Sequence, residues 1–121
     1  MMKIRDKGII VISTFSDEQS VRLLAKKVLN ARLCACVNFA SINSMYLWKG
    51  RTEDHKEILA LFKTTRKSAE KLKKALVAHH PYEVPEIVEL EMSDVNTGYL
   101  SWLTAETSTN RVSQKRHNPA K

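Results

Sequence analysis

The stretch Ile42-Asn-Ser-Met-Tyr-Leu-Trp48, continued by Lys49-Gly50 and the returning segment 57–63, decides the fold. Aromatic and β-branched residues favour extended structure on both sides of the Lys49-Gly50 pair. A two-residue connection with glycine is typical of a tight hairpin turn, because glycine adopts a positive φ without strain. The stretch therefore predicts two long antiparallel strands joined at Lys49-Gly50, with the polar residues 53–56 at the exposed start of the second strand.

A strand, a helix and another strand are predicted before the hairpin. The β-branched run 8–15 is typical of a buried strand. Ser16 and Gln19 have the spacing of a capping box, which begins a helix by bonding its first free amides. Residues 33–37 form a second apolar strand, and we expect a bend or bulge over 38–41 before the hairpin. The apolar stripe of the helix recurs at helical spacing and comprises Val21, Leu24, Ala25, Val28 and Leu29.

A helix, a strand and a short terminal helix are predicted after the hairpin. Thr64 or Thr65 is a candidate cap of the second helix, which ends before Pro81 because proline cannot continue a helix. An alternating strand follows over 86–92, and the terminal helix covers 99–106. The second helix has the stripe Ala69, Leu72, Ala75 and Leu76. In the strand, one face consists of Val88, Leu90 and Met92, and Glu89 and Glu91 face solvent. In the terminal helix, the side chains expected to point inward are Tyr99, Trp102 and Leu103.

The predicted element order is β-α-β-β-α-β with an extra C-terminal helix. Two crossovers around a central hairpin give the split-βαβ, or ferredoxin-like, α+β fold, with a four-stranded antiparallel sheet and two helices on one face. The runs 33–37 and 58–62 are apolar on both faces, which is typical of strands buried on both sides. A single helix layer covers only one face, so we expect copies of the same chain to cover the other.

Length and charge favour one domain with a basic tail. A chain of 121 residues suits a single domain, which we expect over 1–106. The segment 107–121 has almost no apolar residues, so we expect it to be disordered. Much of the net charge of +7 lies at the ends of the chain, and nucleic-acid binding by a basic groove of the body is not favoured. The tail has no acid and contains the cations Arg111, Lys115, Arg116 and Lys121.

The thiols and the first residues favour the cytoplasm. Cys34 and Cys36 are the only cysteines, and they lie too close together for an easy mutual disulfide. A reducing compartment is the simpler interpretation. The apolar run 9–12 is too short for a signal peptide or a membrane span, so we expect no membrane association.

His79 and His80 are the first candidates for chemistry. Imidazoles bind borderline divalent ions, and a thiolate such as that of Cys36 could join them. The alternative, which the residues alone favour, is that one histidine caps a helix end and the other packs or hydrogen-bonds. Cys34 and Cys36 share a strand face, and the favoured interpretation is that they are buried thiols acting as small hydrophobes and not metal ligands.

A second candidate is a polar cluster formed by Lys63, Tyr82, Glu83 and Glu86 near the predicted strand ends. Such a cluster is able to line a ligand pocket or supply general acid–base groups. The favoured alternative is a capping and salt-bridge network, because no nucleophile, base and orienting group form a triad. We therefore expect no enzyme.

Several motifs together resemble the CutA divalent-cation-tolerance family. They occur in the family's order and span about residues 8–106. The resemblance implies a ferredoxin-like protomer and a homotrimer, similar to that of PII signalling proteins, built by the long hairpin and sheet edges. It also implies binding of copper or other divalent cations, a role in metal tolerance and response, and no established catalytic reaction. The motifs are Ala31–Asn38, Tyr46–Gly50, Phe62–Thr65, His79–Glu86 and Tyr99–Leu103.

The resemblance also implies roles for particular residues. His79 and His80 fall on the segment associated with metal binding, and Cys36 matches a thiol position. Ser13 stands where family members carry a cysteine, and a hydroxyl is a poorer copper ligand than a thiolate, so we expect copper to be weakly held. The positions that match clefts between subunits are Trp48, Lys63, Tyr82 and Glu86.

The leading hypothesis is a trimeric, cytoplasmic, copper-binding protein of metal tolerance without catalytic activity. The alternative is a PII-like sensor or signalling module whose inter-subunit cleft takes an unidentified small molecule or serves a protein partner. An enzyme in that cleft, or nucleic-acid binding through the basic ends, ranks lower.

Overall fold

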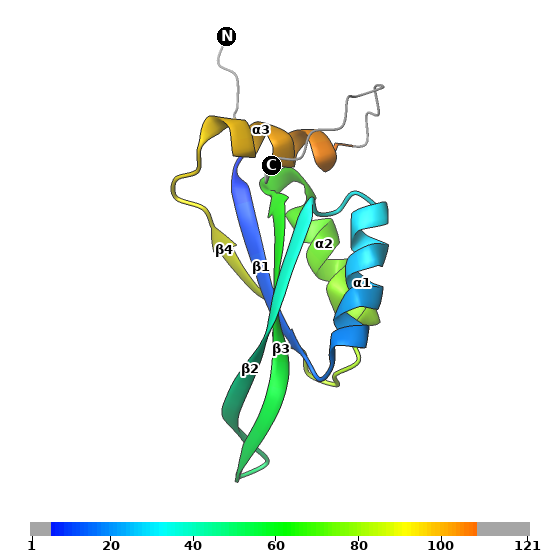
Figure 1. Cartoon of the computed structure of the whole chain (residues 1–121), viewed down its shortest axis with the longest axis vertical. Helices are drawn as coiled ribbons and strands as arrows, with labels where there is room; N and C mark the ends of the chain where they lie inside the picture. Colours follow the sequence, from blue (N-terminus) through cyan, green and yellow to red (C-terminus); the bar gives the residue numbers. More distant parts are fainter. Residues whose placement is uncertain (1–5, 109–121) are drawn as a thin grey trace.

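The computed structural model describes residues 6–108. Within them the ferredoxin-like order and the additional C-terminal helix are confirmed (Figure 1). The elements are β1 (Gly8–Phe15), α1 (Glu18–Asn30), β2 (Cys36–Trp48), β3 (Arg51–Thr65), α2 (Arg66–His79), β4 (Val88–Glu91) and α3 (Thr97–Glu106).

One antiparallel four-stranded sheet, ordered β2-β3-β1-β4, organises the molecule. Helices α1 and α2 lie against one face of this sheet, and α3 lies at the end opposite the hairpin tip (Figure 1). The core lies between the sheet and the two helices, because the apolar side chains of both layers point there. Its largest fully buried side chains are Phe15, Phe62, Ile9, Leu72 and Leu76.

The predicted hairpin is confirmed, and it is longer than expected. Its register runs without interruption from Cys36 opposite Lys63 to Trp48 opposite Arg51, so the predicted bend over 38–41 is wrong. The turn residues Lys49 and Gly50 both have positive φ, 52° and 78°. This geometry matches the strand twist in a two-residue hairpin. The distal part of β2 and β3 extends beyond the helix layer as a two-stranded ribbon (Figure 1). We call this ribbon, residues 42–57, the arm.

The first helix begins one residue later than the capping box predicts. Asp17 is its N-cap, with extended backbone, and its Oδ1 accepts a hydrogen bond from the Ser20 amide at 2.7 Å. A carboxylate at this position also matches the positive end of the helix dipole. Four of the five stripe residues are buried, whereas Leu29 is 37% exposed. Thr65 is the N-cap of α2, although its side chain makes no capping hydrogen bond.

The prediction for β4 is wrong about which face is covered. Val88 and Leu90 do share a face, but they are 42% and 48% exposed. Glu89 does not face solvent freely, because it forms ion pairs with Arg66 and Lys73 of α2 at 2.5 and 2.7 Å. The strand is amphipathic as predicted, but its charged side faces the basic helix and its apolar side faces away from it.

The sheet face opposite the helices is apolar. Pairing places Ile10 beside Leu90 and Ile12 beside Val88 and Leu61. Because side chains alternate along a strand, these residues point away from the buried Ile9 and Val11. We call this surface the open face, residues Ile10, Ile12, Leu59, Leu61, Val88 and Leu90.

The C-terminal helix buries Leu103 fully, while Tyr99 and Trp102 are partly buried and pair with ring centroids 5.6 Å apart. Thr107 is also buried, and its hydroxyl donates to the Leu103 carbonyl at 2.8 Å. Most of the tail that the sequence predicts to be disordered, residues 109–121, lies outside the described residues. Within 6–108, no helix combines the length and apolarity needed to cross a membrane.

Candidate functional site

The two adjacent histidines separate at the end of α2. His79 is the last helical residue and is exposed. His80 has extended backbone, as the residue before proline should, and its partly buried ring turns toward the end of β1. It stacks on Phe15 with centroids 4.4 Å apart and an interplanar angle of 20°. These positions agree with the alternative to metal binding that the residues alone favour, in which one histidine ends a helix and the other packs and hydrogen-bonds.

Both ring nitrogens of His80 have protein partners. The Tyr82 amide donates to Nδ1 at 3.0 Å, so the proton of the neutral ring lies on Nε2. Nε2 then donates to the Thr14 carbonyl at 2.9 Å. Burial lowers the pKa of His80, and the Thr14 carbonyl and the Glu57 charge oppose this only in part. The imidazole is therefore held neutral and oriented.

Ser13 lies directly beside His80, at the position where the family resemblance leads one to expect a cysteine. Its Oγ is 3.1 Å from Nε2 of His80, and its side chain is fully buried. The two residues are far apart in sequence and meet because the end of α2 passes the end of β1. The oxygen beside this imidazole nitrogen is therefore that of a hydroxyl, a harder ligand than a thiolate sulfur.

Cys36 lies elsewhere. It pairs with Lys63, whereas Thr14, next to Ser13, pairs with Leu59. Four residues of β3 separate these positions, roughly 13 Å at the usual strand rise. Among residues 6–108, no three His, Cys, Asp or Glu side chains are grouped closely enough to hold a metal ion. The residues of one chain therefore do not fit a multi-ligand metal site made of His79, His80 and Cys36.

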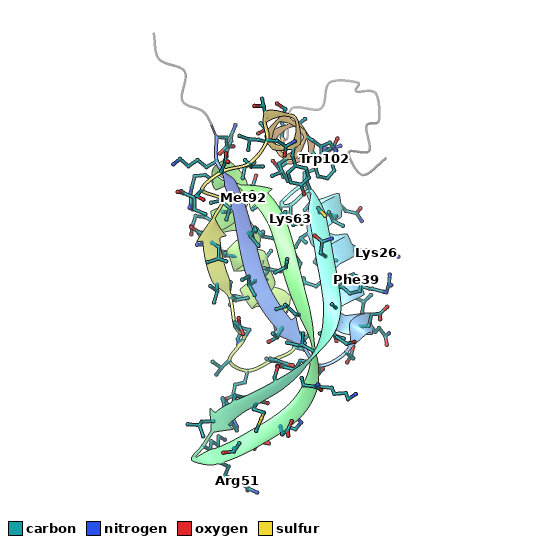
Figure 2. All side chains as sticks on the ribbon, turned by 60° about the vertical axis from the view of Figure 1, so that its left-hand side comes forward. Lys26, Phe39, Arg51, Lys63, Met92 and Trp102 are labelled. Carbon is teal, nitrogen blue, oxygen red and sulfur yellow. The ribbon has the colours of Figure 1, made fainter. Side chains whose placement is uncertain are left out.

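Lys63 belongs to the Cys36 end of the sheet and not to the other predicted cleft residues. Its ammonium lies 6.0 Å from the ring centroid of Tyr99. Figure 2 shows Lys63 near Trp102 and far from Arg51 at the tip of the arm. Cys34, on the adjoining loop, is buried, which raises the pKa of its thiol to about 12.

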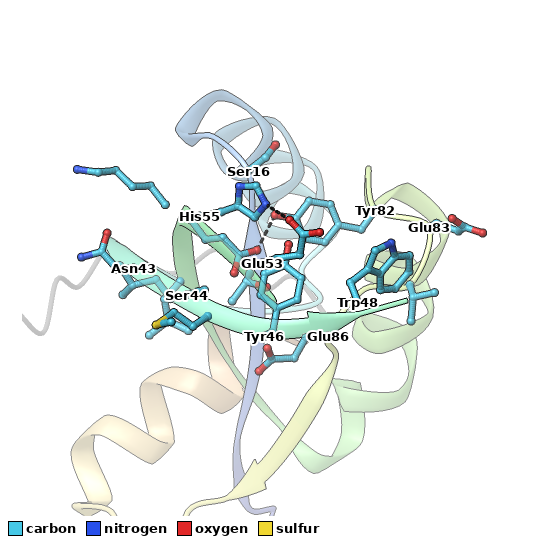
Figure 3. Close-up of a pocket in the computed structure, with 17 residues that line it drawn as sticks. Ser16, Asn43, Ser44, Tyr46, Trp48, Glu53, His55, Tyr82, Glu83 and Glu86 are labelled. Carbon is cyan, nitrogen blue, oxygen red and sulfur yellow. Dashed lines mark hydrogen bonds and ion pairs between the residues drawn. The ribbon is translucent and has the colours of Figure 1, made fainter. Parts of the chain in front are cut away.

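A groove of about 1150 Å³ opens between the arm and the loop 82–86 (Figure 3). We call it the arm groove. Of the four residues predicted to line a cleft, Trp48, Tyr82 and Glu86 line this groove and Lys63 does not. Glu83, from the predicted polar cluster, lines it as well.

Two polar pairs lie in the arm groove. The Tyr82 hydroxyl donates to Oε2 of Glu57 at 2.6 Å. Burial, followed by this hydrogen bond, raises the pKa of the Tyr82 phenol above its usual value. Nε2 of His55 lies 3.0 Å from Oε1 of Glu53, and the His55 ring is tilted against Tyr46 at 6.0 Å. The Tyr82 pair joins the loop to β3 by a single short contact.

Sequence reasoning missed Glu53, His55 and Glu57 as groove residues, because a run of polar residues at a strand start is usually only solvated. Their alternate spacing was the available signal, since positions 53, 55 and 57 share one strand face. The register places them opposite Tyr46, Ser44 and Ile42, which line the same groove.

Comparison with known proteins agrees with the fold. The family model described as CutA1 divalent ion tolerance protein matches residues 9–106. The Divalent-cation tolerance protein CutA of Pyrococcus horikoshii is 41% identical over 99 residues, covering 82% of this chain and 97% of that protein. The protein of the same name from Escherichia coli O139:H28 is 38% identical over 99 residues, covering 81% and 88%.

A solved structure gives the same result. The crystal structure of CutA1 from Pyrococcus horikoshii matches with a TM-score of 0.80 at 40% identity, over 84% of this chain and 99% of that one. Both the sequence match and the shared architecture cover nearly the whole described body. The chain therefore belongs to the CutA1 divalent ion tolerance family.

Proposed function

We propose that the chain acts in divalent-cation tolerance as a non-enzymatic homotrimer that binds copper or a related cation weakly. The observation that carries the proposal is the match over residues 9–106 to a family named for divalent ion tolerance. Two relatives that cover most of the chain bear the same name. A cytoplasmic location is part of the proposal, supported by the two free cysteines.

The open face supports self-assembly. It exposes branched apolar side chains, including Val88 and Leu90, on a sheet layer that the helices do not cover. An apolar face of this kind is normally buried against another chain. The arm adds exposed Met45 and Leu47, at 71% and 77% exposure, which a neighbouring copy would also cover. Light scattering should therefore give three times the chain mass of 13.8 kDa.

Weak metal binding is proposed at the histidines. His79 is exposed and able to coordinate without breaking a described contact, whereas a metal at either ring nitrogen of His80 would first displace a hydrogen bond. Ser13 offers a hydroxyl beside His80 where a thiolate would strengthen copper binding. Cys36 remains a weaker candidate, since ligands from another copy would be needed to join it to a histidine site.

The non-enzymatic part of the proposal is supported by the state of the candidate nucleophiles. Burial raises the pKa of Cys34 to about 12, and the pKa of Tyr82 is also raised, so neither group is an activated anion near neutral pH. The alternative of a PII-like sensor draws support from the arm groove, while the family name favours metal tolerance.

Growth and binding experiments test this function together. In an Escherichia coli strain that lacks its own CutA, expression of the chain should restore growth at inhibitory copper concentrations. Calorimetric titration with Cu²⁺ should show binding that the double substitution His79→Ala and His80→Ala weakens at least tenfold. His55→Ala is the matched control, because His55 lies in the arm groove. Absence of rescue, or equal binding by the double variant, would contradict the proposal.

A further inference from the structure

Helices α1 and α2 carry most of the positive charge of the body. They contain eight lysines and arginines but only two acids, Glu18 and Glu70. In the rest of residues 8–106 the acids outnumber the lysines and arginines by ten to five. The small net charge of the body, on which the sequence prediction against nucleic acid rests, therefore combines a basic helix layer with an acidic remainder. A local surface of one sign attracts a partner of the opposite sign whatever the net charge is.

The acids near the two helices leave five of these cations unpaired. Glu18 pairs with Arg22 and Glu70 pairs with Lys73, each at 2.8 Å, and Arg66 is paired with β4. The other five are exposed lysines, and none forms an ion pair with any residue of the described range 6–108. We call them the helix-layer lysines: Lys26, Lys27, Lys67, Lys71 and Lys74.

The helix-layer lysines of α1 and α2 belong to one surface. Arg22 lies over the ring of Phe39 in β2 at 5.1 Å, so this flank of α1 faces β2. Lys27 comes five residues later, on the other flank, which faces α2. Lys73 is bound to β4, so Lys71, on the other flank of α2, faces α1. Figure 1 shows the two helices side by side on one face of the sheet, and Lys26 points away from the sheet in Figure 2.

Both ends of the described chain lie at the first turn of α2. The Lys67 amide donates to Oδ1 of Asp6 at 3.3 Å, and the Ser68 hydroxyl donates to the Thr107 carbonyl at 3.5 Å. The sequence before residue 6 and after residue 108 therefore continues from the basic helix layer. Neither of these two segments contains an acid. Their lysines and arginines are Lys3, Arg5, Arg111, Lys115, Arg116 and Lys121.

The lysine stripe of α2 is unfavourable for the helix itself, which is a second and independent sign of an external partner. Lys67 and Lys71 are four residues apart and Lys74 follows three later, so like charges are neighbours on one face. The first turn of α2 contains no acid and begins with two cations, at the end where the helix dipole favours anions. A polyanion on this surface would relieve the repulsion. Conflicts with local preference of this kind are expected at functional surfaces.

The residue types of the surface favour a phosphate backbone over other polyanions. Lysine binds phosphates as a point charge and reads no base sequence. The helices contain no aromatic residue on which a single strand could stack. Their apolar stripes are buried in the core and not available to a membrane, which leaves Leu23, Leu29 and Val77 exposed. The exposed residues of α2 include no hydroxyl or amide side chain for the 2′-hydroxyls of RNA.

The outer side of the helix layer also stays accessible in the proposed trimer. The open face lies on the other side of the sheet from α1 and α2, and assembly through that face and the arm leaves the helices outside (Figure 1). We propose that the helix-layer lysines bind the backbone of double-stranded DNA without sequence preference. Three such surfaces on one trimer would act together on one duplex and strengthen binding by avidity.

Fluorescence anisotropy of a labelled DNA duplex of mixed sequence, titrated with the full chain, tests this proposal. Wild type should bind saturably at low salt. The triple substitution Lys67→Gln, Lys71→Gln and Lys74→Gln should weaken binding at least tenfold, and glutamine keeps the helix propensity of lysine. The plot of log affinity against log salt should become shallower by about 2–3, because each lost phosphate contact contributes about 0.9 to the slope.

The matched control removes the same charge from the arm. Lys49→Gln, Arg51→Gln and Lys56→Gln replace three exposed cations that lie far from the helix layer, and the affinity of this variant for DNA should stay within twofold of wild type. Light scattering checks that both variants are compared at the wild-type mass.

Four outcomes would overturn the proposal. They are absence of saturable DNA binding by wild type, an equal loss in the arm variant, an unchanged salt slope in the helix variant, and tighter binding to anionic phospholipid vesicles or duplex RNA at equal phosphate concentration. The proposal is independent of metal tolerance, because none of these substitutions changes His79, His80 or Cys36. A chain that restores copper tolerance but does not bind DNA would therefore overturn this inference alone.

Discussion

The Tyr82 hydroxyl and the Glu57 carboxylate lie 2.6 Å apart and connect the loop after α2 to the middle of β3. Glu57 is 8% exposed, and this hydroxyl is the hydrogen-bond partner described for its side chain. The pair fixes one wall of the arm groove against the other. Its removal should therefore affect both stability and the position of the loop.

Tyr82→Phe should lower the free energy of unfolding by about 1–3 kcal/mol, because it leaves a buried acceptor without its donor. Urea denaturation at neutral pH measures the change. Tyr46→Phe is the matched control, since Tyr46 is 42% exposed and its hydroxyl makes no described hydrogen bond. An equal loss in the two variants would mean that the Glu57 contact contributes nothing specific.

The ring of His80 should make stability depend on pH just below neutrality. Its pKa is lowered in the folded chain, so the unfolded chain takes up the proton first as pH falls below about 6.5. Stability should be fully present above that pH and decline as pH falls toward the folded pKa. NMR titration of the ring should give a midpoint below 6.5, and His80→Gln should flatten the decline. A midpoint above 6.5 would contradict the hydrogen-bond and burial argument.

Glu89 should act in a separate and more acidic window. Its hydrogen bonds to Arg66 and Lys73 lower its pKa to about 2. The stability it contributes is present above the unfolded value of about 4.3 and is lost as pH falls toward 2. Acid denaturation should shift to higher pH in Glu89→Gln. Because Glu89 is a partly exposed ion pair, the change should be small and should shrink in high salt. His80→Gln, measured in the same acid range, is the control.

Ser13→Cys should raise copper affinity at least tenfold. The substitution places a sulfur where the hydroxyl now lies 3.1 Å from Nε2 of His80, and thiolate is the softer ligand. Titration with Cu⁺ under reducing conditions measures the gain. Ser16→Cys provides a thiol at an exposed position nearby, and a comparable gain there would show that any added thiol is sufficient.

Leu90→Arg should dissociate the assembly without unfolding the chain. Leu90 is 48% exposed on the open face, so a single chain tolerates arginine there, whereas a buried interface does not. Light scattering should show a mass near 13.8 kDa, with an unchanged circular dichroism spectrum. Val77→Arg is the control on the outer surface of α2, where Val77 is 58% exposed. A trimer mass for Leu90→Arg would place the interface elsewhere.

The architecture was predictable because it depends on local patterns. Strand, helix and turn each have a characteristic spacing, and Lys49-Gly50 marks the hairpin directly. Two errors concern the start of a helix and the course of a strand. Asp17, not Ser16, caps α1, and β2 passes through 38–41 without a bend, because pairing with β3 holds its backbone extended.

The candidate site was predictable only in part, because it depends on contacts between distant segments. The motif resemblance identified Trp48, Tyr82 and Glu86, which do share a groove. No spacing rule shows that Lys63 lies at the other end of the sheet. Glu57 was also missed, since only the packing of the loop onto β3 reveals that this acid is buried.

The projecting arm has a consequence for measurement. A two-stranded ribbon without a core of its own is only marginally stable, so its amides should exchange with solvent faster than those of β1. A neighbouring copy that packs on the arm should slow that exchange. Deuterium uptake by residues 42–57 therefore becomes a readout of occupancy, with the amides of β1, which is paired on both edges, as the slowly exchanging reference.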